Sequence, residues 1–238
     1  MSGVWGLVAC QPGSPPCLRT GLTVDQALER LEAGESPQRL LESFHLTTAD
    51  LIALLGHAAL GDDQAEEGIG LVQSPPSRPW LEPVLSDSTW RTLLPSAPKP
   101  ARLALVAGLF QVHDFWEASH EAAQQADDLG ERAVSAYWHG IAHRREPDSG
   151  NASYWFRRVG QHPIFVPLAD SVRPLLTALP DRSAGAPLLD GNRWNPFGFI
   201  AFCHDGTPPP ALAPLSRRLQ RREMIALLNE SASALLSL

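Results

Sequence analysis

Two segments of the chain carry ionisable side chains at the same i, i+4, i+7 spacing. Six residues form the two triplets: His113, Glu117 and His120 in the first, and His139, His143 and Glu146 in the second. Successive residues of an α-helix rotate by about 100°, so each triplet would occupy one narrow stripe of a helix surface. The shared spacing suggests that the two stripes serve one site.

A turn at Asp128-Leu129-Gly130 would bring the two stripes together on antiparallel helices. The register then pairs His113 with Glu146, Glu117 with His143, and His120 with His139. Four imidazoles and two carboxylates are the ligand chemistry of Zn, Fe and Mn in helical bundles. The sequence therefore predicts a site for one or two divalent metal ions, with all six residues as ligands. Glu117 and Glu146 are also candidates for a general base.

Three further residues could take part in chemistry at this site. Arg145 and Arg158 could orient a small anionic substrate through paired hydrogen bonds, and His162 could enter the site from a loop. The alternative for each guanidinium is a salt bridge within the fold, for example to Asp114 or Glu146. Four aromatic residues nearby favour a shielded pocket over a solvated face: Trp116, Tyr137, Trp138 and Trp155.

These residues support three functional hypotheses. The first is a metal-dependent hydrolase or oxygenase that acts on a small anionic substrate. The second is a non-enzymatic regulatory or interaction protein, in which the His and Glu side chains form a structural network. The third is a metal-free enzyme that uses the same residues as acid and base. Residue types alone do not separate these alternatives.

Composition and charge exclude several classes of protein. The chain has 238 residues, of which 44% are hydrophobic and 19% are charged, as expected for a globular protein. It contains no apolar run of about 18 residues and no secretory signal, so we expect a cytoplasmic protein without a membrane segment. Residues 1–75 hold three Arg against ten acidic residues. That balance disfavours binding to a nucleic-acid backbone.

The first 61 residues carry explicit helix-start signals. Three capping patterns are present: Thr23-x-x-Gln26, Ser36-Pro37 and Thr47-x-x-Asp50. Apolar residues follow each of them at helical spacing. Residues 1–61 are therefore predicted to form a compact three-helix unit that resembles a helix-turn-helix adaptor.

The rest of the chain is predicted to be helical after a connecting segment. Residues 62–100 begin acidic and become rich in Pro, as in a linker or a strap, and Trp80 and Trp90 favour the strap. Residues 101–238 are predicted to form a larger bundle around the antiparallel hairpin. Its helices are expected at 101–127, 131–145, 152–159, 166–178, 196–204 and 214–237. No strand pairs are evident, so the predicted fold class is all-α.

The N-terminal unit resembles a small prokaryotic helix-turn-helix family of unknown function, often called antitoxin-like. The residues that carry the likeness are Pro16-Cys17-Leu18-Arg19-Thr20-Gly21-Leu22-Thr23-Val24, Leu28, Gly34, Ser36-Pro37 and Leu46-Thr47-Asp50-Leu51. The resemblance implies a three-helix fold and a protein partner bound through this unit. The family usually has Gly-Thr-Arg after the first Arg, whereas this chain has Thr20-Gly21-Leu22 and lacks that basic residue. Nucleic-acid binding is therefore not expected.

The C-terminal unit resembles an uncharacterised bacterial helical family. The likeness rests on several motifs: His113-Asp114, Glu117, Ser119-His120, Tyr137-Trp138-His139, His143-Arg144-Arg145-Glu146-Pro147-Asp148, Asn151-Ala152, Tyr154-Trp155-Phe156-Arg157-Arg158-Val159-Gly160, His162-Pro163, Trp194-Asn195-Pro196 and Gln220-Arg221-Arg222-Glu223. This resemblance implies no activity. Two resemblances on one chain indicate a fusion of two modules.

Overall fold

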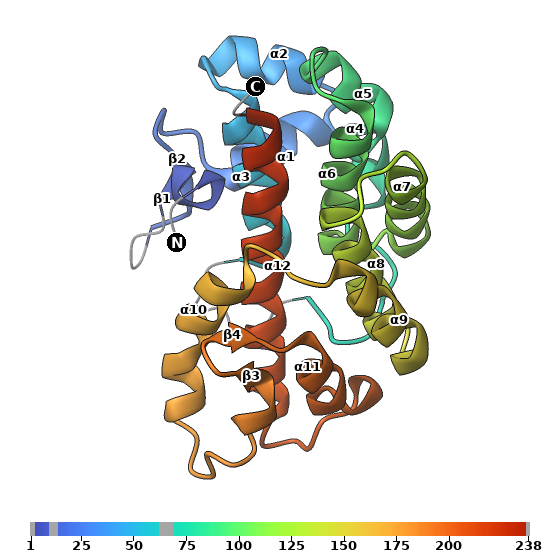
Figure 1. Cartoon of the computed structure of the whole chain (residues 1–238). Coiled ribbons are helices and arrows are strands. Elements are labelled where there is room, and N and C mark those ends of the chain that lie inside the picture. The colour runs from blue at the N-terminus through green and yellow to red at the C-terminus, as the bar shows by residue number, and fades with distance from the viewer. Residues whose placement is uncertain (1–2, 10–13, 62–68, 237–238) are drawn as a thin grey trace.

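The computed structural model describes residues 3–9, 14–61 and 69–236. Within these residues the chain forms twelve α-helices and two hairpins of two-residue strands. The all-α prediction is therefore confirmed. Figure 1 shows the longest helix, α12, standing among the other elements, with α1–α3 at one end of it and α10 and α11 at the other.

The N-terminal helices begin at the predicted caps. They are α1 (Val24–Glu32), α2 (Pro37–Phe44) and α3 (Thr48–Leu60). The Thr23 hydroxyl accepts a hydrogen bond from the Gln26 amide at 3.1 Å, and the Gln26 side chain accepts one from the Thr23 amide. Thr47 and Asp50 form the same reciprocal box. These local bonds satisfy amide groups that a helix start leaves unpaired, which explains why the starts were readable from sequence.

Two short antiparallel hairpins were not predicted. Strand β1 (Val8–Ala9) pairs with β2 (Cys17–Leu18), and β3 (Leu189–Asp190) pairs with β4 (Arg193–Trp194). Two residues are too few to show the apolar alternation by which a strand is recognised. The expectation that no strands pair is therefore corrected.

The segment between the two predicted units contains short helices. The acidic start of the predicted linker, residues 62–68, lies outside the described residues. Beyond it, the chain forms α4 (Glu82–Leu85) and α5 (Asp87–Leu93). The Trp90 side chain is fully buried, and the Gln73 amide donates a hydrogen bond of 2.9 Å to the Arg145 carbonyl. Within the predicted strap of residues 62–100, residues 69–79 are the part bonded to Arg145 at the end of α8. From here on, the name strap is used for residues 69–79 alone.

Four consecutive helices carry or flank most of the predicted site residues. They are α6 (Lys99–Val112), α7 (Trp116–Asp128), α8 (Val134–Arg145) and α9 (Ser149–Val159). Neighbours in this series pack against one another, and they lie side by side on the right of Figure 1. The turn between α7 and α8 includes Gly130, whose φ of 97° favours glycine. The predicted hairpin is present.

The single helix expected over residues 101–127 is two helices. The chain breaks at His113-Asp114-Phe115, where Asp114 has a φ of 66° and the Phe115 amide donates to the Phe110 carbonyl at 3.0 Å. This is the bonding of a helix end with a left-handed residue after the last turn. Aspartate tolerates that conformation better than most residues, and Arg145 and Ser74 both bond the Asp114 carboxylate. Distant partners therefore stabilise a break that has no Gly or Pro signal.

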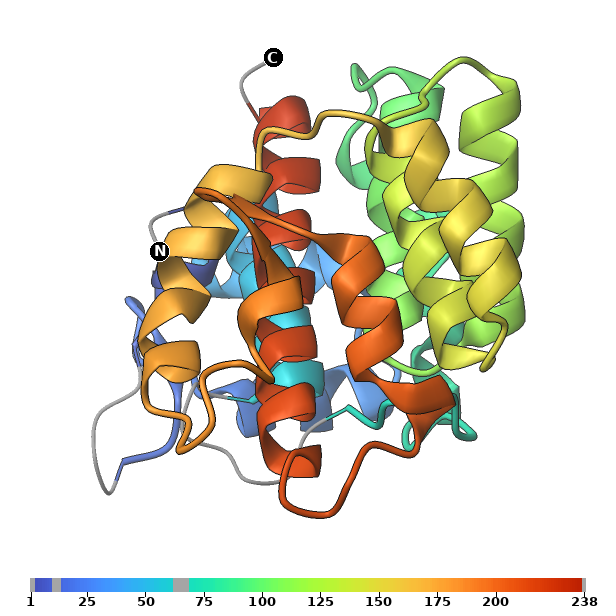
Figure 2. The same ribbon diagram turned by 60° about the horizontal axis from the view of Figure 1, so that its bottom comes forward.

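The C-terminal helices close the bundle. They are α10 (Phe165–Thr177), α11 (Pro196–Phe202) and α12 (Ala213–Leu236). Helix α12 packs against α3, α6, α8 and α10. Figure 2, turned so that the bottom of Figure 1 comes forward, shows α12 with α10 on one side and with α11 and the α6–α9 helices on the other. The long C-terminal helix is therefore the element that joins all parts of the fold.

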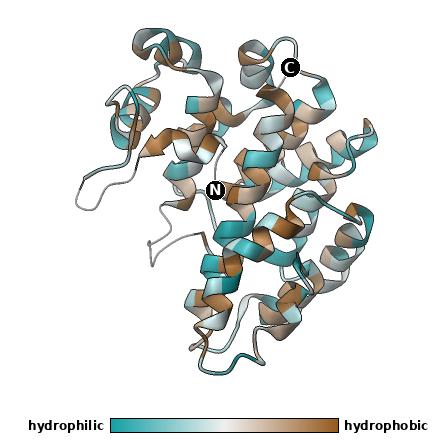
Figure 3. Ribbon diagram, turned by 60° about the vertical axis from the view of Figure 1, so that its left-hand side comes forward, coloured by the Kyte–Doolittle hydropathy of each residue, from teal (hydrophilic) through white to brown (hydrophobic). Residues whose placement is uncertain are grey.

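The buried apolar residues form one continuous cluster that extends from Val4 to Leu235. It includes side chains from α1–α3, from the strap and from the C-terminal helices. Figure 3 shows hydrophobic and hydrophilic residues alternating along the helices, as expected for helices with one inward face. Among the described residues, no helix is both long enough and apolar enough to cross a membrane.

Candidate metal centre

Three of the predicted histidines meet between α7 and α8. His120 comes from α7, and His139 and His143 come from consecutive turns of α8. One ring nitrogen of each lies within 4.8 Å of the corresponding nitrogens of the other two. The His120 ring centroid is 4.2 Å from that of His139 and 5.1 Å from that of His143. We call these three residues the histidine trio.

His139 is the most enclosed member of the trio. Its side chain is 1% exposed, and neither ring nitrogen has a hydrogen-bond partner in the described part of the chain. The ring stacks on Trp155 from α9 at a centroid distance of 3.7 Å. A buried polar group without a partner is costly, so a native structure that retains one calls for an explanation such as a bound ion.

Two imidazoles of the trio, those of His120 and His139, favour the neutral form that binds metals. Burial, with further contributions from His120, His143 and Arg158, lowers the pKa of His139 to about 3. Burial also lowers the pKa of His120, and the neighbouring His143 adds to this effect while Glu146 opposes it. A neutral imidazole has a lone pair on one nitrogen. At neutral pH, His139 and His120 can therefore act as ligands without first losing a proton.

Glu146 contacts His143 and does not form the pair with His113 that the sequence predicts across the hairpin. Nδ1 of His143 lies 2.8 Å from a carboxylate oxygen of Glu146 on the same chain segment. If Nδ1 carries the proton and donates it to Glu146, Nε2 presents its lone pair to the trio. Histidine ligands in metal sites are commonly fixed by a carboxylate in this way. Glu146 thus takes a positioning role, whereas the sequence predicted a direct ligand.

A second acidic residue lies beside this pair but is already engaged. Ligand atoms of His143, Glu146 and Asp148 also fall within 4.8 Å of one another. Asp148, however, caps α9: its carboxylate accepts from the Asn151 amide at 2.9 Å and from the Asn151 side chain at 2.8 Å. Asp148 is not among the predicted site residues, and the Asp-x-x-Asn pattern is instead typical of a helix N-cap. The histidine trio is therefore the better metal site of the two.

Two tryptophans form walls of the site. Trp116 stacks on His120 at 5.1 Å between ring centroids, and its indole nitrogen donates to the Ala142 carbonyl at 2.9 Å. Trp155 covers the other side of the trio through His139. The bond from Trp116 to Ala142 joins α7 to α8 beside the imidazoles. The other two predicted aromatic residues bond elsewhere: Tyr137 donates to Glu223 at 2.9 Å and Trp138 to Ser231 at 3.3 Å.

His113 lies away from the trio. Because α6 ends before it, the His113 side chain turns toward α3, where Nε2 lies 3.0 Å from the Leu55 carbonyl oxygen. Burial and the charge of Arg78 lower the pKa of His113 to about 4. The predicted register between His113 and Glu146 is not formed. The break at Asp114 is the physical reason, since it rotates His113 out of the stripe that a continuous helix would make.

Glu117 also points away from the trio. It is exposed, at the start of α7, and lines an open cavity with Trp116. The predicted pairing of Glu117 with His143 is replaced by the contact between His143 and Glu146. Of the six predicted ligands, the structure brings together His120, His139 and His143, with Glu146 behind them.

The two predicted substrate-binding guanidinium groups are both ion-paired. Arg145 is fully buried and donates to the carbonyls of Gly70 and Gln111, at 3.1 Å each, and to the Asp114 carboxylate. Arg158 donates to Asp127 at 2.7 Å. The structural alternative therefore holds for Arg145, which fastens the strap. Arg158 lies closer to the trio, with its guanidinium 5.2 Å from the Trp155 ring centroid.

His162 occupies a separate buried position. Its ring packs at 5.2 Å from Tyr137, and burial lowers its pKa to about 4. Nδ1 accepts a long hydrogen bond of 3.4 Å from the Ile164 amide. Among the described residues, the ring nitrogens of His162 do not cluster with those of the histidine trio. The expectation that His162 enters the site from a loop is not supported by this placement.

Comparisons with known proteins add no assignment. No protein-family model matches the chain, and neither the curated proteins nor the solved structures contain a significant match. The geometry of the histidine trio and of its neighbours is therefore the basis for a functional proposal.

Proposed function

We propose that the chain binds one divalent metal ion, Zn, Fe or Mn, through His120, His139 and His143. The observation that carries the proposal is the buried His139 ring: among the described residues its two nitrogens have no hydrogen-bond partner, while a nitrogen of each neighbouring histidine lies within 4.8 Å. Zinc–nitrogen distances are about 2.0–2.1 Å, so the three rings would draw closer together around an ion. Rotation of the half-buried His120 side chain is the simplest way to achieve this.

Glu146 supports the same proposal. It fixes one nitrogen of His143 and leaves the other for the ion, as a carboxylate behind a histidine ligand does. The carboxylate also supplies negative charge near the ion, which favours a dication. Glu146 therefore acts as a positioning residue.

The structural alternative fits these contacts less well. Histidines that only hold a bundle together donate and accept hydrogen bonds, as His113 does with Leu55. His139 has no such bond within the described residues, and Trp155 and His143 only stack on it. A regulatory or interaction protein with a purely structural network would not benefit from this unpaired ring.

Three imidazole ligands favour hydrolytic chemistry. A metal held by three protein ligands keeps a coordination position for water, and the ion lowers the pKa of that water toward neutrality. When bound, the ion would thus supply a hydroxide nucleophile. The chain's own groups would exclude bulk water through Trp116 and Trp155, and would keep His143 oriented through Glu146.

The first experiment is a metal titration of the purified, chelator-treated chain. Calorimetry with Zn²⁺, Mn²⁺ and Fe²⁺ should show one site per chain for at least one ion. His139→Ala and His143→Ala should abolish it, and Glu146→Gln should weaken it by about tenfold to a hundredfold.

The matched control is His113→Ala, which removes a buried histidine that lies outside the trio. It should bind the metal as the unmodified chain does. Absence of binding by the folded, chelator-treated chain would refute the proposal. Equal loss in His113→Ala and His139→Ala, with both variants folded by circular dichroism, would also count against the three-histidine site.

A further inference from the structure

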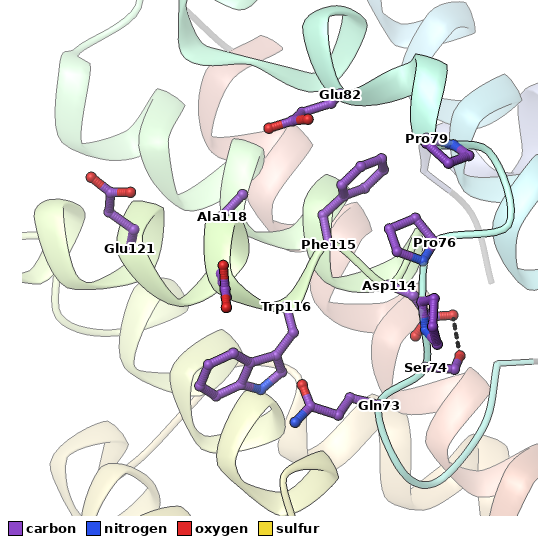
Figure 4. Close-up of a pocket in the computed structure, with 12 residues that line it drawn as sticks. Gln73, Ser74, Pro76, Pro79, Glu82, Asp114, Phe115, Trp116, Ala118 and Glu121 are labelled. Atoms are coloured by element: carbon purple, nitrogen blue, oxygen red, sulfur yellow. Dashed lines mark hydrogen bonds between the residues drawn. The ribbon is translucent and has the colours of Figure 1, made fainter.

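A cavity of about 660 Å³ opens beside the histidine trio. Its walls come from three separate elements: the strap, the start of α4, and the first turns of α7 with the break before it. Figure 4 shows Glu82 on one side, Gln73 and Trp116 on the other, and Phe115 between them. The volume is in the range that holds a small organic molecule.

The lining carries negative charge only. Twelve residues line the cavity; four of them are acidic, and Lys, Arg and His are absent from this set. Arg145 neutralises Asp114. Glu82 and Glu117 are exposed and make no hydrogen bond or ion pair with any residue that the structure describes. Their charge therefore acts on whatever occupies the cavity, and it repels anions.

The remaining lining is apolar and aromatic. Phe115 and Trp116 contribute rings, and Pro75, Pro76 and Pro79 contribute rigid apolar surface. The faces of aromatic rings attract ammonium and guanidinium groups within about 6 Å. A hydrated metal ion gains nothing from proline and phenylalanine walls. An organic cation with an apolar body would use both the rings and the carboxylates.

The strap side of the cavity is held in place from behind. Arg145 donates to the carbonyls of Gly70 and Val72, and Gln220 donates to Gly70 at 2.9 Å. Ser74 donates to Asp114 at 3.1 Å, which joins the strap to the break between α6 and α7. These bonds tie the two walls together in the absence of any ligand, so little ordering is required on binding.

We infer that this cavity binds a small organic cation, with its ammonium or guanidinium group between the carboxylates of Glu82 and Glu117 and its apolar body against Phe115, Trp116 and the prolines. The site is distinct from the proposed metal site. It shares Trp116 with it, since that ring lines the cavity and stacks on His120. A molecule in the cavity would therefore lie beside the metal site with one tryptophan between them.

Benzylammonium is a suitable probe, with benzyl alcohol and benzoate as neutral and anionic analogues of the same shape. Ligand-observed NMR and calorimetry should detect benzylammonium alone at millimolar concentration, with an affinity that falls as NaCl is raised. The double variant Glu82→Gln/Glu117→Gln should bind about tenfold more weakly. Glu32→Gln, an exposed change in α1 outside the lining, should bind normally.

The measurement separates this inference from the metal proposal when repeated with His139→Ala. Benzylammonium should bind that variant as it binds the unmodified chain, whether or not the metal proposal holds. The inference fails if the probe does not bind, if benzyl alcohol or benzoate binds equally well, or if the double Gln variant binds unchanged. Displacement of the probe from His139→Ala by Mg²⁺ or Zn²⁺ would instead assign the carboxylates to a metal ion.

Discussion

Helix α8 presents two kinds of ionisable side chain to the protein interior. Arg145 bonds carbonyls of the strap and of α6 and the Asp114 carboxylate, so every nitrogen of its guanidinium has a partner. His139, less than two turns away, has none among the described residues. Both side chains are almost completely buried. Burial alone therefore does not distinguish a structural group from a functional one.

The state of the hydrogen bonds makes the distinction. Arg145 offsets its desolvation with an ion pair to Asp114 and with hydrogen bonds to three backbone carbonyls, and it fixes the strap and the break between α6 and α7. His139 leaves its nitrogens unbonded beside the imidazoles of His120 and His143, an arrangement that a cation would complete. The following predictions test whether one helix really divides its polar residues into these two roles.

The largest effect is expected for Arg145→Ala. The change removes the cation that pairs with the Asp114 carboxylate and the hydrogen bonds to the carbonyls of Gly70 and Gln111, which should lower the free energy of unfolding by about 3–5 kcal/mol. Urea denaturation measures the change, with the exposed Arg132→Ala as control. If the variant remains folded it should still bind the metal. A loss below about 1 kcal/mol would contradict the structural role.

His139→Leu should show the opposite pattern. Leucine fills a similar volume without unpaired nitrogens, so the metal-free variant should unfold within about 1 kcal/mol of the metal-free parent. At a metal concentration about a hundredfold above the dissociation constant, the parent should gain about 2.7 kcal/mol and the variant nothing. Thermal unfolding with and without metal measures both quantities. A severely destabilised metal-free variant would assign His139 a structural role.

Stability should fall in acid because buried histidines resist protonation. The pKa values of His113, His139 and His162 are lowered to about 4, 3 and 4, against about 6.5 in an unfolded chain. As pH falls below about 6.5, the unfolded chain takes up protons that the folded chain refuses, so the free energy of unfolding decreases by up to about 1.4 kcal/mol per pH unit for each ring. The decrease ends once the pH passes the folded-state values.

Urea titrations at several pH values test this expectation. His139→Leu should reduce the slope between about pH 4 and 6.5 by up to one proton relative to the parent. An identical slope for His139→Leu and the parent would show that His139 is protonated in the folded chain. That result would weaken its assignment as a metal ligand.

The smallest effect is expected at Asp148. Loss of its bonds to Asn151 in Asp148→Ala should cost about 1 kcal/mol, as for other helix caps, and Asp148→Asn should restore most of it. Neither change should alter metal affinity by more than about twofold, which is less than 0.5 kcal/mol. Calorimetry checks the affinity and urea denaturation the stability. A large loss of affinity would move the proposed ion toward His143, Glu146 and Asp148.

Local signals determined most of the secondary structure. Thr23, Ser36 and Thr47 cap helices where the sequence placed them, because a cap involves only the next three residues. The Gly130 turn followed from the same short-range chemistry. The matched spacing of His120 against His139 and His143 also predicted their convergence, since helix periodicity and one turn were sufficient to fix it.

The cavity illustrates what local signals miss. Glu82, Glu117 and the strap prolines come from three separate elements, so no spacing in the sequence relates them. The roles of Arg145 and Glu146 were likewise open, because a guanidinium or carboxylate shows its role only through its partner. The bonds to Asp114 and to the strap give Arg145 a structural role, and the contact with His143 places Glu146 behind that imidazole.

The sequence by itself determined most of the helices, the α7–α8 hairpin and the three histidines that meet there, since each depends on contacts a few residues apart or on one turn. Tertiary structure decided which polar residues remain available for a ligand. Contacts of Asp114 with Arg145 and of His113 with Leu55 join residues 31 and 58 positions apart and remove His113 from the stripe. Such contacts depend on how whole helices pack, which no local pattern encodes.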